Sequence, residues 1–419
     1  MSSEWETGTL GQFIELKRGY DLPQAKRVSG IYPLVSSSGV TDTHHEPMVK
    51  GPGVVTGRYG TIGKVFFVSE DFWPLNTTLY VRDFKGNDPK FISYFLQTID
   101  FLAYSDKAAV PGVNRNHLHE AMVSMPNLVI QKQIASVLSA LDDRIALLRE
   151  TNATLEAIAQ ALFKSWFVDF EPVHAKARGE SPQEMDDATA ALFPDSFEES
   201  ELGMIPKGWR VKHLGDVTDR ITKGTTPTTL KKPFVNEGIN FVKVESITAT
   251  GELLPEKFAF IDDETHLLLK RSQLEAGDIL ITIAGTIGRV AEISEDHIPA
   301  NTNQAVALIR PVYNLLPGGL IKRFLQGKES KQRMSERIVQ AVQANLSLGS
   351  LSDMQMVVPP SDTVTLLYDA GLSAIDAGIK QNRRKIQTLA QLRDTLLPKL
   401  ISGQLRLPEA QVLLAEELP

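Results

Sequence analysis

The sequence predicts an α+β protein with two duplicated globular domains, each containing small β-sheets and each followed by a long helix. Two observations lead to this fold class. Residues 60–65 (GTIGKV) return almost unchanged as residues 285–290 (GTIGRV), which indicates an internal repeat. After Pro126, and again after Pro359, the spacing of apolar residues changes from about two to about 3.5. This is the change expected where strands give way to a helix.

Other landmarks recur in the same order in both halves. The SED triplet at residues 69–71 returns at 294–296, the Asn-Thr step at 76–77 returns at 301–302, and a Trp precedes a Leu-Gly step near the start of each half. Short apolar runs bounded by Gly and Pro indicate strands at residues 53–56, 64–68, 278–282 and 305–309. We therefore assign the first domain to residues 1–126 and the second to residues 204–360.

Each domain is followed by a heptad pattern. In the first copy the core positions are Ile134, Leu138, Leu141, Ile145, Leu148, Asn152, Leu155, Ala159, Leu162 and Trp166; in the second they are Tyr368, Leu372, Ile375, Ile379, Asn382, Ile386, Leu389, Arg393, Leu396 and Leu400. The pattern predicts spacer helices at residues 127–168 and 361–403, each with a core roughly 50 Å long. Pro398 can kink or stop the last turn of the second helix, before a tail at 404–419.

The matching lengths and phases favour two helices that pair with each other over two helices that pack only on their own domains. Counted from Ile134 or Tyr368, the core positions are unchanged when the order is reversed. Antiparallel pairing about their centre places Asn152 in the same layer as Asn382. A buried Asn in an apolar seam costs stability but can fix the register. The alternative is that each Asn faces water at a weak core position.

The charge of the chain is concentrated in one segment. The 419 residues include 44 Lys and Arg and 51 Asp and Glu, for a net charge of −7. Residues 169–203, which we interpret as an acidic linker, hold ten acidic and two basic residues and so carry −8, whereas the rest of the chain sums to +1. Nucleic-acid-binding proteins usually show a basic surface. Because the acidity belongs to the linker, the net charge does not exclude a DNA-binding function for the two domains.

A search for catalytic motifs gives negative results. Without Cys, disulfides, Cys-ligated zinc, iron–sulfur clusters and thiol nucleophiles are excluded. Five residues separate Gly57 from Gly63, and Val65 stands where a P-loop needs a hydroxyl. The step from Glu15 to Lys17 has the spacing of a nuclease acid-x-Lys pair but lacks the upstream Pro-Asp. No nucleophile elbow, amino-methyltransferase clamp or zinc spacing of His is present, so we expect no catalytic residues and no metal.

The remaining interpretation is a binding protein. No uncharged apolar run reaches ~18 residues, and the N-terminus does not resemble a signal peptide, so we expect a cytoplasmic location. Loops of both domains bring Arg, Lys, Asn and hydroxyls to Gly-bearing turns, and these side chains read base edges and grip phosphates. The candidate DNA-binding residues are Lys17, Arg18, Ser36, Ser37, Ser38, Arg58, Tyr59, Lys64 and Asn76 in the first domain, and Lys223, Thr225, Thr226, Lys243, Ser246, Arg289, Asn301 and Asn303 in the second.

The repeated GTIG motif, the two heptad helices and the linker motifs FVDF (167–170), FPDS (193–196) and PKGW (206–209) resemble the specificity (S) subunit of type I restriction-modification enzymes. The resemblance covers nearly the whole chain. It implies two target-recognition domains, each reading one half of a bipartite DNA sequence. It also implies that the spacer helices form an antiparallel coiled coil with pseudo-two-fold symmetry, which acts as a ruler and docks two methyltransferase (M) subunits. Motor-nuclease (R) subunits would then join. S-adenosylmethionine, ATP and Mg²⁺ would be bound by these partners and not by this chain.

The two domains differ widely between residues 5–47 and 209–255, which favours an asymmetric target. The leading hypothesis is therefore a non-catalytic DNA-recognition subunit. Two alternatives remain at this stage. One is a self-sufficient methyltransferase or nuclease with degenerate motifs. The other is a coiled-coil scaffold that does not bind DNA, which would tolerate alanine at Arg58, Lys64, Lys223 and Arg289 together.

Overall fold

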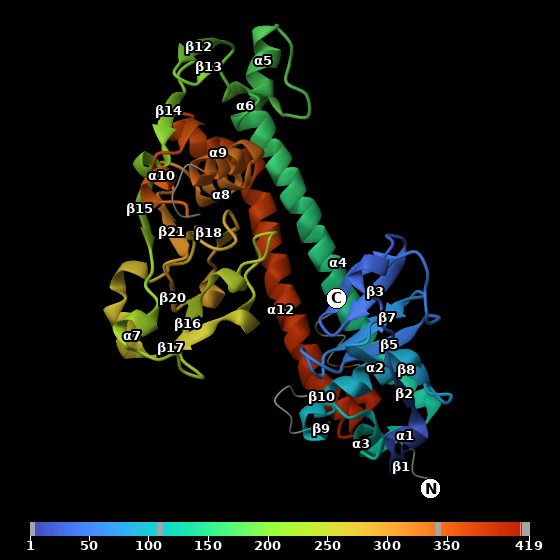
Figure 1. Ribbon diagram of the computed structural model, residues 1–419. Helices are drawn as coiled ribbons and strands as arrows, with labels where there is room; N and C mark the ends of the chain where they lie inside the picture. The colour runs from blue at the N-terminus through green and yellow to red at the C-terminus, as the bar shows by residue number, and fades with distance from the viewer. Residues whose placement is uncertain (1–4, 107–111, 340–344, 411, 413–419) are drawn as a thin grey trace. The chain divides into compact units, whose positions relative to one another are not determined.

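A computed structural model of the chain describes residues 5–106, 112–339, 345–410 and 412. The chain forms two compact units, one made of residues 1–150 and 383–419 and the other of residues 151–382. The boundary between them falls inside both long helices, α4 (Leu128–Phe167) and α12 (Ser373–Ile401). Each unit, called here unit 1 and unit 2, therefore contains one globular domain and a section of both helices (Figure 1).

The globular part of unit 1 consists, in chain order, of β1 (Trp5–Thr9), α1 (Leu10–Phe13), β2 (Glu15–Arg18), the 3₁₀ helix η1 (Gln24–Lys26), β3 (Tyr32–Ser36), β4 (Gly39–His44), β5 (Gly53–Gly57), β6 (Val65–Val68), β7 (Trp73–Pro74), β8 (Thr78–Asp83), α2 (Pro89–Gln97), η2 (Phe101–Tyr104), β9 (Ser105–Asp106), β10 (Gly112–Val113), α3 (Arg115–His119) and β11 (Met122–Pro126).

Unit 2 begins, after the end of α4, with α5 (Glu171–Ala177), α6 (Asp187–Ala191), β12 (Phe197–Ser200) and β13 (Gly203–Pro206). It continues with β14 (Arg210–His213), η3 (Leu214–Val217), β15 (Thr218–Lys223), η4 (Pro227–Leu230), β16 (Ile239–Val242), η5 (Val244–Ser246), η6 (Pro255–Lys257), β17 (Ala259–Ile261), α7 (Asp263–Leu268), η7 (Lys270–Ser272), β18 (Ile279–Thr282), β19 (Val290–Glu292), η8 (Glu295–His297), β20 (Ala300–Thr302), β21 (Val306–Pro311), α8 (Gly318–Gln326), α9 (Lys328–Val339), α10 (Leu348–Ser352), β22 (Gln355–Val358) and α11 (Ser361–Gly371).

The two globular parts have the same sheet topology, which confirms the predicted α+β duplication. The four-stranded sheet of unit 1 has the order β2-β8-β5-β6, and that of unit 2 has the order β15-β21-β18-β19. The three-stranded sheets correspond as β4-β3-β7 and β17-β16-β20, and in each the central strand pairs in parallel with one neighbour. Strand β1 pairs with β11 as β14 pairs with β22.

The repeated GTIG motif forms the loop of an equivalent hairpin in each unit, β5–β6 and β18–β19. Both glycines of each copy have a positive φ: 76° at Gly60 and 78° at Gly63, and 72° at Gly285 and 86° at Gly288. A side chain strains this backbone conformation, whereas Gly adopts it freely. The motif therefore repeats because the hairpin loop needs glycines at these two positions.

The first spacer helix matches its prediction closely, since α4 covers Leu128–Phe167. The second is divided into α11 and α12 at Leu372, whose φ is −114° and ψ is −30°. At this break a Cβ on Gly371 would lie 2.5 Å from Cη2 of Trp166, so the missing side chain lets the indole pack against the backbone. Pro398 lies within α12, in its last turn before Ile401.

In each unit the sections of the two helices share one hydrophobic core with the globular part. In unit 1, Leu138 and Leu141 of α4 are buried together with Leu389 of α12 and Phe91 of α2. In unit 2, Phe163 of α4 lies in one core with Leu372 and with Leu320 of α8. The helices therefore pack both on the sheets and on each other, and the two arrangements considered from the sequence are not exclusive.

The acidic linker, residues 169–203, is a folded part of unit 2. Its helices α5 and α6 and its hairpin β12–β13 lie together beyond the end of α4 (Figure 1). Val173 is fully buried and Phe193 is 2% exposed. The Phe193 ring packs edge-on against Trp166 at a centroid distance of 5.5 Å, and Nζ of Lys176 donates to the carbonyl oxygen of Ala190 at 3.0 Å. The acidic side chains therefore belong to a segment, residues 169–203, that packs through its apolar residues.

Replacing Phe193 with alanine tests whether this segment packs on unit 2. Because the ring is buried among aromatic side chains, Phe193→Ala should lower the free energy of unfolding by about 3–5 kcal/mol, as measured by denaturant titration. The matched control is Met204→Ala, since Met204 is 60% exposed on the same element. Equal stabilities for the two variants would show that the segment does not pack.

Candidate nucleic-acid interface

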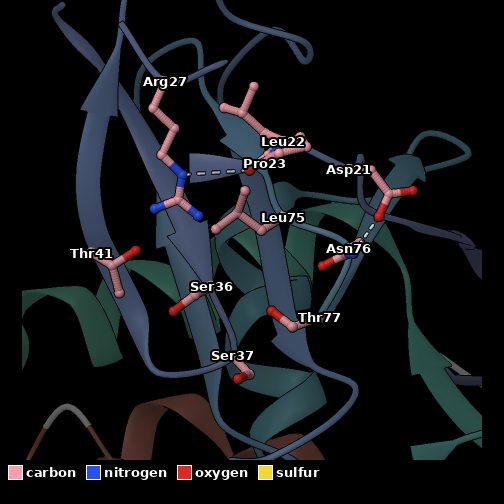
Figure 2. Close-up of a pocket in the computed structure, with 10 residues that line it drawn as sticks. All are labelled: Asp21, Leu22, Pro23, Arg27, Ser36, Ser37, Thr41, Leu75, Asn76 and Thr77. Atoms are coloured by element: carbon pink, nitrogen blue, oxygen red, sulfur yellow. Dashed lines mark hydrogen bonds between the residues drawn. The ribbon is translucent and has the colours of Figure 1, made fainter. Parts of the chain in front are cut away.

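Unit 1 has an open pocket of about 400 Å³, shown in Figure 2. It lies where the loop after β2, the end of β3 and the segment before β8 meet. The residues that line it are Asp21, Leu22, Pro23, Arg27, Ser36, Ser37, Thr41, Leu75, Asn76 and Thr77. The pocket thus brings together Ser36, Ser37 and Asn76, three of the residues expected to bind DNA, and adds the polar residues Asp21, Arg27, Thr41 and Thr77.

The serine turn is held by its own side chains. Oγ of Ser36 accepts a hydrogen bond from the amide of Ser38 at 3.2 Å and lies 2.9 Å from the Ser38 hydroxyl. Ser37 also borders the loop that carries the GTIG motif, since a Cβ on Gly57 would lie 3.3 Å from the Cβ of Ser37. The turn therefore joins the pocket to the β5–β6 loop.

The first residues of the β5–β6 loop are tied to the opposite wall of the pocket. The amides of Arg58 and Tyr59 both donate to the carbonyl oxygen of Thr77, at 2.9 and 3.2 Å. The Arg58 guanidinium lies 4.6 Å from the centroid of the Tyr59 ring, a cation–π arrangement, and Lys64 is exposed at the end of the same loop. Arg58, Tyr59 and Lys64 thus extend the polar surface beyond the pocket.

Charged side chains surround the pocket. Arg18 forms an exposed ion pair with Asp21 at 3.4 Å, and Asp21 also accepts a hydrogen bond from the Asn76 amide. Nζ of Lys17 lies 5.4 Å from the centroid of the Tyr20 ring. Nε of Arg27 donates to the carbonyl oxygen of Leu22 at 3.5 Å, and Figure 2 shows its guanidinium directed over the hollow. Asp21 therefore orients the side-chain amide of Asn76 and the guanidinium of Arg18 at the same edge of the pocket.

Unit 2 brings together part of its predicted set. Lys223 is exposed at the end of β15, next to Gly224, whose amide donates to the carbonyl oxygen of Asn303 at 3.0 Å. The amide of Thr226 donates to Oε1 of Gln304 at 3.1 Å, and its hydroxyl bonds the same oxygen. Lys223, Thr225, Thr226 and Asn303 thus lie around one loop contact, together with Gln304.

Two basic residues of unit 2 are partly occupied by contacts within the chain. Nζ of Lys243 lies 2.7 Å from Oε1 of Glu245, and this hydrogen bond lowers the pKa of the Glu245 carboxyl. Nη1 of Arg289 donates to the carbonyl oxygen of Ile247 at 2.7 Å. Arg289 is half-buried, whereas its repeat counterpart, Lys64, is exposed. Arg289 is therefore a weaker candidate than Lys64 for a phosphate contact.

Two predicted contacts require correction, because Ser246 and Asn301 are both 0% exposed. Oγ of Ser246 donates to the carbonyl oxygen of Lys257 at 3.1 Å. Oδ1 of Asn301 accepts from the Ser272 hydroxyl at 2.7 Å, and its Nδ2 donates to the carbonyl oxygen of Leu269 at 3.2 Å. These side chains satisfy buried backbone and hydroxyl groups and cannot reach a duplex.

Asn152 and Asn382, the two polar residues at core positions of the spacer helices, lie in the same layer, as the reversible order of the core positions predicts. Within unit 2, Nδ2 of Asn382 donates to Oδ1 of Asn152 at 2.9 Å, and Nδ2 of Asn152 lies 3.5 Å from the carbonyl oxygen of Ile379. Both side chains are half-buried. The layer is therefore the expected one, and the role of the pair in fixing the register stays a prediction.

Two properties of the described residues bear on other functions. In that part of the chain, no three His, Asp or Glu side chains gather closely enough to hold a metal ion. None of its helices is both long and apolar enough to cross a bilayer.

Comparison with known proteins identifies the family. The family model described as the type I restriction modification DNA specificity domain matches residues 2–157 and 206–391. The chain belongs to this family. Each of the two matched segments contains one globular domain and reaches into the helix that follows it.

Individual relatives agree with this assignment. The chain is 25% identical over 397 residues to the type I restriction enzyme HindI specificity subunit of Haemophilus influenzae, covering 82% of this chain and 84% of that protein. It is 22% identical over 427 residues to the MjaVIII specificity subunit of Methanocaldococcus jannaschii, covering 96% and 93%. The crystal structure of a type I restriction-modification S subunit from M. genitalium shares the fold, with a TM-score of 0.52, 18% identity and coverage of 94% and 96%.

The sequence did not single out Asp21, Arg27 or Thr41, which complete the pocket. Arg27 follows Lys26 in a loop bounded by Pro23 and Gly30, and this basic pair was an available signal. Nothing in the sequence indicates that Asp21 bonds Asn76, because the two residues are 55 positions apart.

The register role of the Asn pair can be tested by cross-linking, since the chain has no Cys of its own. A cysteine pair replacing Leu155 and Gly378 should be joined by a short bifunctional thiol reagent, because a Cβ at Gly378 lies 3.9 Å from Cδ1 of Leu155 and the two positions are therefore neighbours across the seam. Adding Asn152→Leu should lower the cross-linking yield, because an all-apolar layer also accepts pairings shifted by a heptad. Asn314→Leu, in an exposed loop, is the control. An undiminished yield would show that the pair does not set the register.

Proposed function

We propose that this chain is the DNA sequence-recognition subunit of a type I restriction-modification complex and carries no catalytic activity of its own. The observation that carries the proposal is the match of both halves of the chain to the specificity-domain family. The pocket of unit 1 supports it, because Arg, Asn, Ser and Thr side chains converge there on one open hollow. These are the residue types that hydrogen-bond to base edges and phosphates.

We further propose that the two domains read two different half-sites of a bipartite target. The domains share one topology, but their polar residues differ in exposure. Asn76 is half-exposed at the pocket, whereas its repeat counterpart, Asn301, is fully buried. Two reading surfaces with different donors and acceptors fit an asymmetric target better than a palindromic one.

The proposal assigns chemistry and much of the electrostatic attraction to partners. Outside residues 169–203 the chain has a net charge of only +1, so most of the phosphate charge must be neutralised by other subunits. We propose that two M subunits dock on the spacer helices, where Ile158 of α4 is 46% exposed, and that R subunits complete the complex in the cytoplasm. S-adenosylmethionine would then bind to the M subunits, and ATP and Mg²⁺ to the partners that cleave DNA.

The experiment that tests the whole proposal is to map methylated adenines in a genome that carries this system, by single-molecule sequencing. A bipartite motif that disappears when this chain is deleted is the expected result. Methylation or cleavage of DNA by the purified chain alone would favour a stand-alone enzyme instead. A motif that persists without the chain would leave only the scaffold function.

Arg27 provides a sharper test of the pocket. If its guanidinium reads a base edge, Arg27→Ala should reduce discrimination at one position of one half-site by about 1–3 kcal/mol, roughly 5- to 150-fold, and leave the other half-site unchanged. The measurement is competition binding by the assembled complex with single-base variants of the mapped target. Arg178→Ala is the matched control, since Arg178 is an exposed arginine paired with Glu180 in unit 2. A uniform loss across all targets would assign Arg27 to a phosphate.

The lysines and arginine outside the pocket should act through phosphates. Replacing Arg58, Lys64 and Lys223 with alanine should make the plot of log affinity against log salt concentration less steep, with little change in base preference. The expected change in slope is roughly 0.9 for each phosphate that the variant no longer neutralises. Arg289 is left unchanged because its guanidinium is bonded to the carbonyl oxygen of Ile247. An unaltered slope and affinity would favour the scaffold that does not bind DNA.

A further inference from the structure

An aspartate recurs at the same place in both spacer helices. Residues 138–145 (LSALDDRI) match residues 372–379 (LSAIDAGI), so Asp142 and Asp376 are equivalent and 234 positions apart. The helices that contact these aspartates are equivalent too. Helices α2 (PKFISYFLQ) and α8 (GGLIKRFLQ) both have nine residues, and the sixth residue is Tyr94 in one and Arg323 in the other. Both of these side chains reach the aspartate of their own repeat.

In unit 1, Asp142 of α4 links the globular domain to the helix pair. The Tyr94 hydroxyl donates to its Oδ2 at 2.5 Å, and Nη1 of Arg393 from α12 donates to its Oδ1 at 2.8 Å. Tyr94 is 2% exposed. Burial and the hydrogen bond to Asp142 raise the pKa of Tyr94, so the hydroxyl remains a proton donor.

In unit 2, Asp376 of α12 makes the corresponding link. Nη2 and Nη1 of Arg323 donate to its two oxygens at 2.6 and 3.0 Å, and the Tyr368 hydroxyl donates to Oδ2 at 2.7 Å. Arg323 is fully buried and Asp376 is 7% exposed. Burial opposes the charged carboxylate, but the hydrogen bond and charge of Arg323 lower the pKa of Asp376 overall, so the pair stays ionised.

Both sites therefore use one carboxylate, one phenol and one guanidinium, but the donors have exchanged places. The globular domain supplies the phenol in unit 1, from Tyr94, and the guanidinium in unit 2, from Arg323. The helices supply the other donor, Arg393 or Tyr368. Each aspartate is therefore paired with one guanidinium, which balances its negative charge, and with one hydroxyl, which donates a further hydrogen bond to a carboxylate oxygen. The same balance reached in two different ways points to a contact that both repeats need.

The contact is directional and close. In unit 2 a Cβ on Gly319 would lie 2.4 Å from Oδ2 of Asp376, so α8 can approach the helix this closely only because Gly stands there. Glu156 of α4 adds an ion pair with Lys322 of α8, and Nε2 of Gln160 donates to the carbonyl oxygen of Arg323 at 3.3 Å. Apolar packing alone would let the globular domain slide and rotate against the spacer helices, whereas charge-assisted hydrogen bonds fix its position and its orientation.

We propose that Asp142 and Asp376 are positioning residues that hold each recognition domain at a fixed orientation on the spacer helices, and so set the half-site spacing that the protein accepts. The effect on half-site spacing rests on the proposed function. The contacts themselves do not depend on it. Base preference should reside in the loops, and spacing preference in these two aspartates and their donors.

The test uses two mild variants, Tyr94→Phe and Tyr368→Phe, which each remove one hydroxyl without leaving a buried charge unpaired. Tyr32→Phe is the control, because no partner of the Tyr32 hydroxyl is seen among the described residues. In the assembled complex, each variant should reduce the preference for the native spacer over spacers one base pair longer or shorter at least threefold. Discrimination between bases within each half-site should be unchanged.

A second readout does not depend on DNA. Spin labels on cysteines replacing Asp42 and Glu150, both in unit 1, should give a narrow distance distribution that broadens in Tyr94→Phe and not in Tyr32→Phe. An unchanged width together with unchanged spacing preference would overturn the inference and leave the proposed function standing. A broadened distribution in a complex that shows no sequence-specific binding would support the positioning contact and reject the proposed function.

Discussion

The hydrogen bond between Asn152 and Asn382 is the interaction that, we propose, fixes how the spacer helices pair. Apolar layers of similar size pair almost equally well when one helix slides by a heptad, because burial has no direction. An amide that loses its partner in the seam costs about 1–3 kcal/mol, so a polar layer separates the correct register from shifted ones. We propose the same role in unit 1 for the ion pair of Asp142 with Arg393, which gives the charged side chain at core position 393 a partner.

Features that repeat along the chain could be predicted from the sequence. The duplication, the extent of α4 and the layer of the Asn pair all follow from spacings that the sequence displays directly. The break at Leu372 and the packing of residues 169–203 could not be predicted in this way. Both involve Trp166, whose ring lies against Gly371 and also contacts the ring of Phe193. Such contacts join residues far apart in the chain, and composition does not reveal them.

The candidate site shows the same limit at the level of single side chains. Residue type pointed to Ser36, Ser37 and Asn76, which converge on one pocket, but it also selected Asn301 and Ser246, which are buried. Asn76 and Asn301 occupy equivalent positions in the repeat. They differ because Leu269 and Ser272 of the second domain cover Asn301 and take its hydrogen bonds. Whether a polar side chain serves the fold or the surface is decided by what lies over it.

The distribution of charge separates specificity from affinity under the proposed function. The acidic residues lie on a packed element of unit 2, and the two domains are close to neutral. Domains with so little net charge attract a duplex only weakly at long range, so sequence discrimination must come from hydrogen bonds of defined geometry. Such bonds discriminate only if donors and acceptors are held in place. That requirement links the pocket, where Asp21 orients Asn76, to the aspartates that seat each domain on its helices.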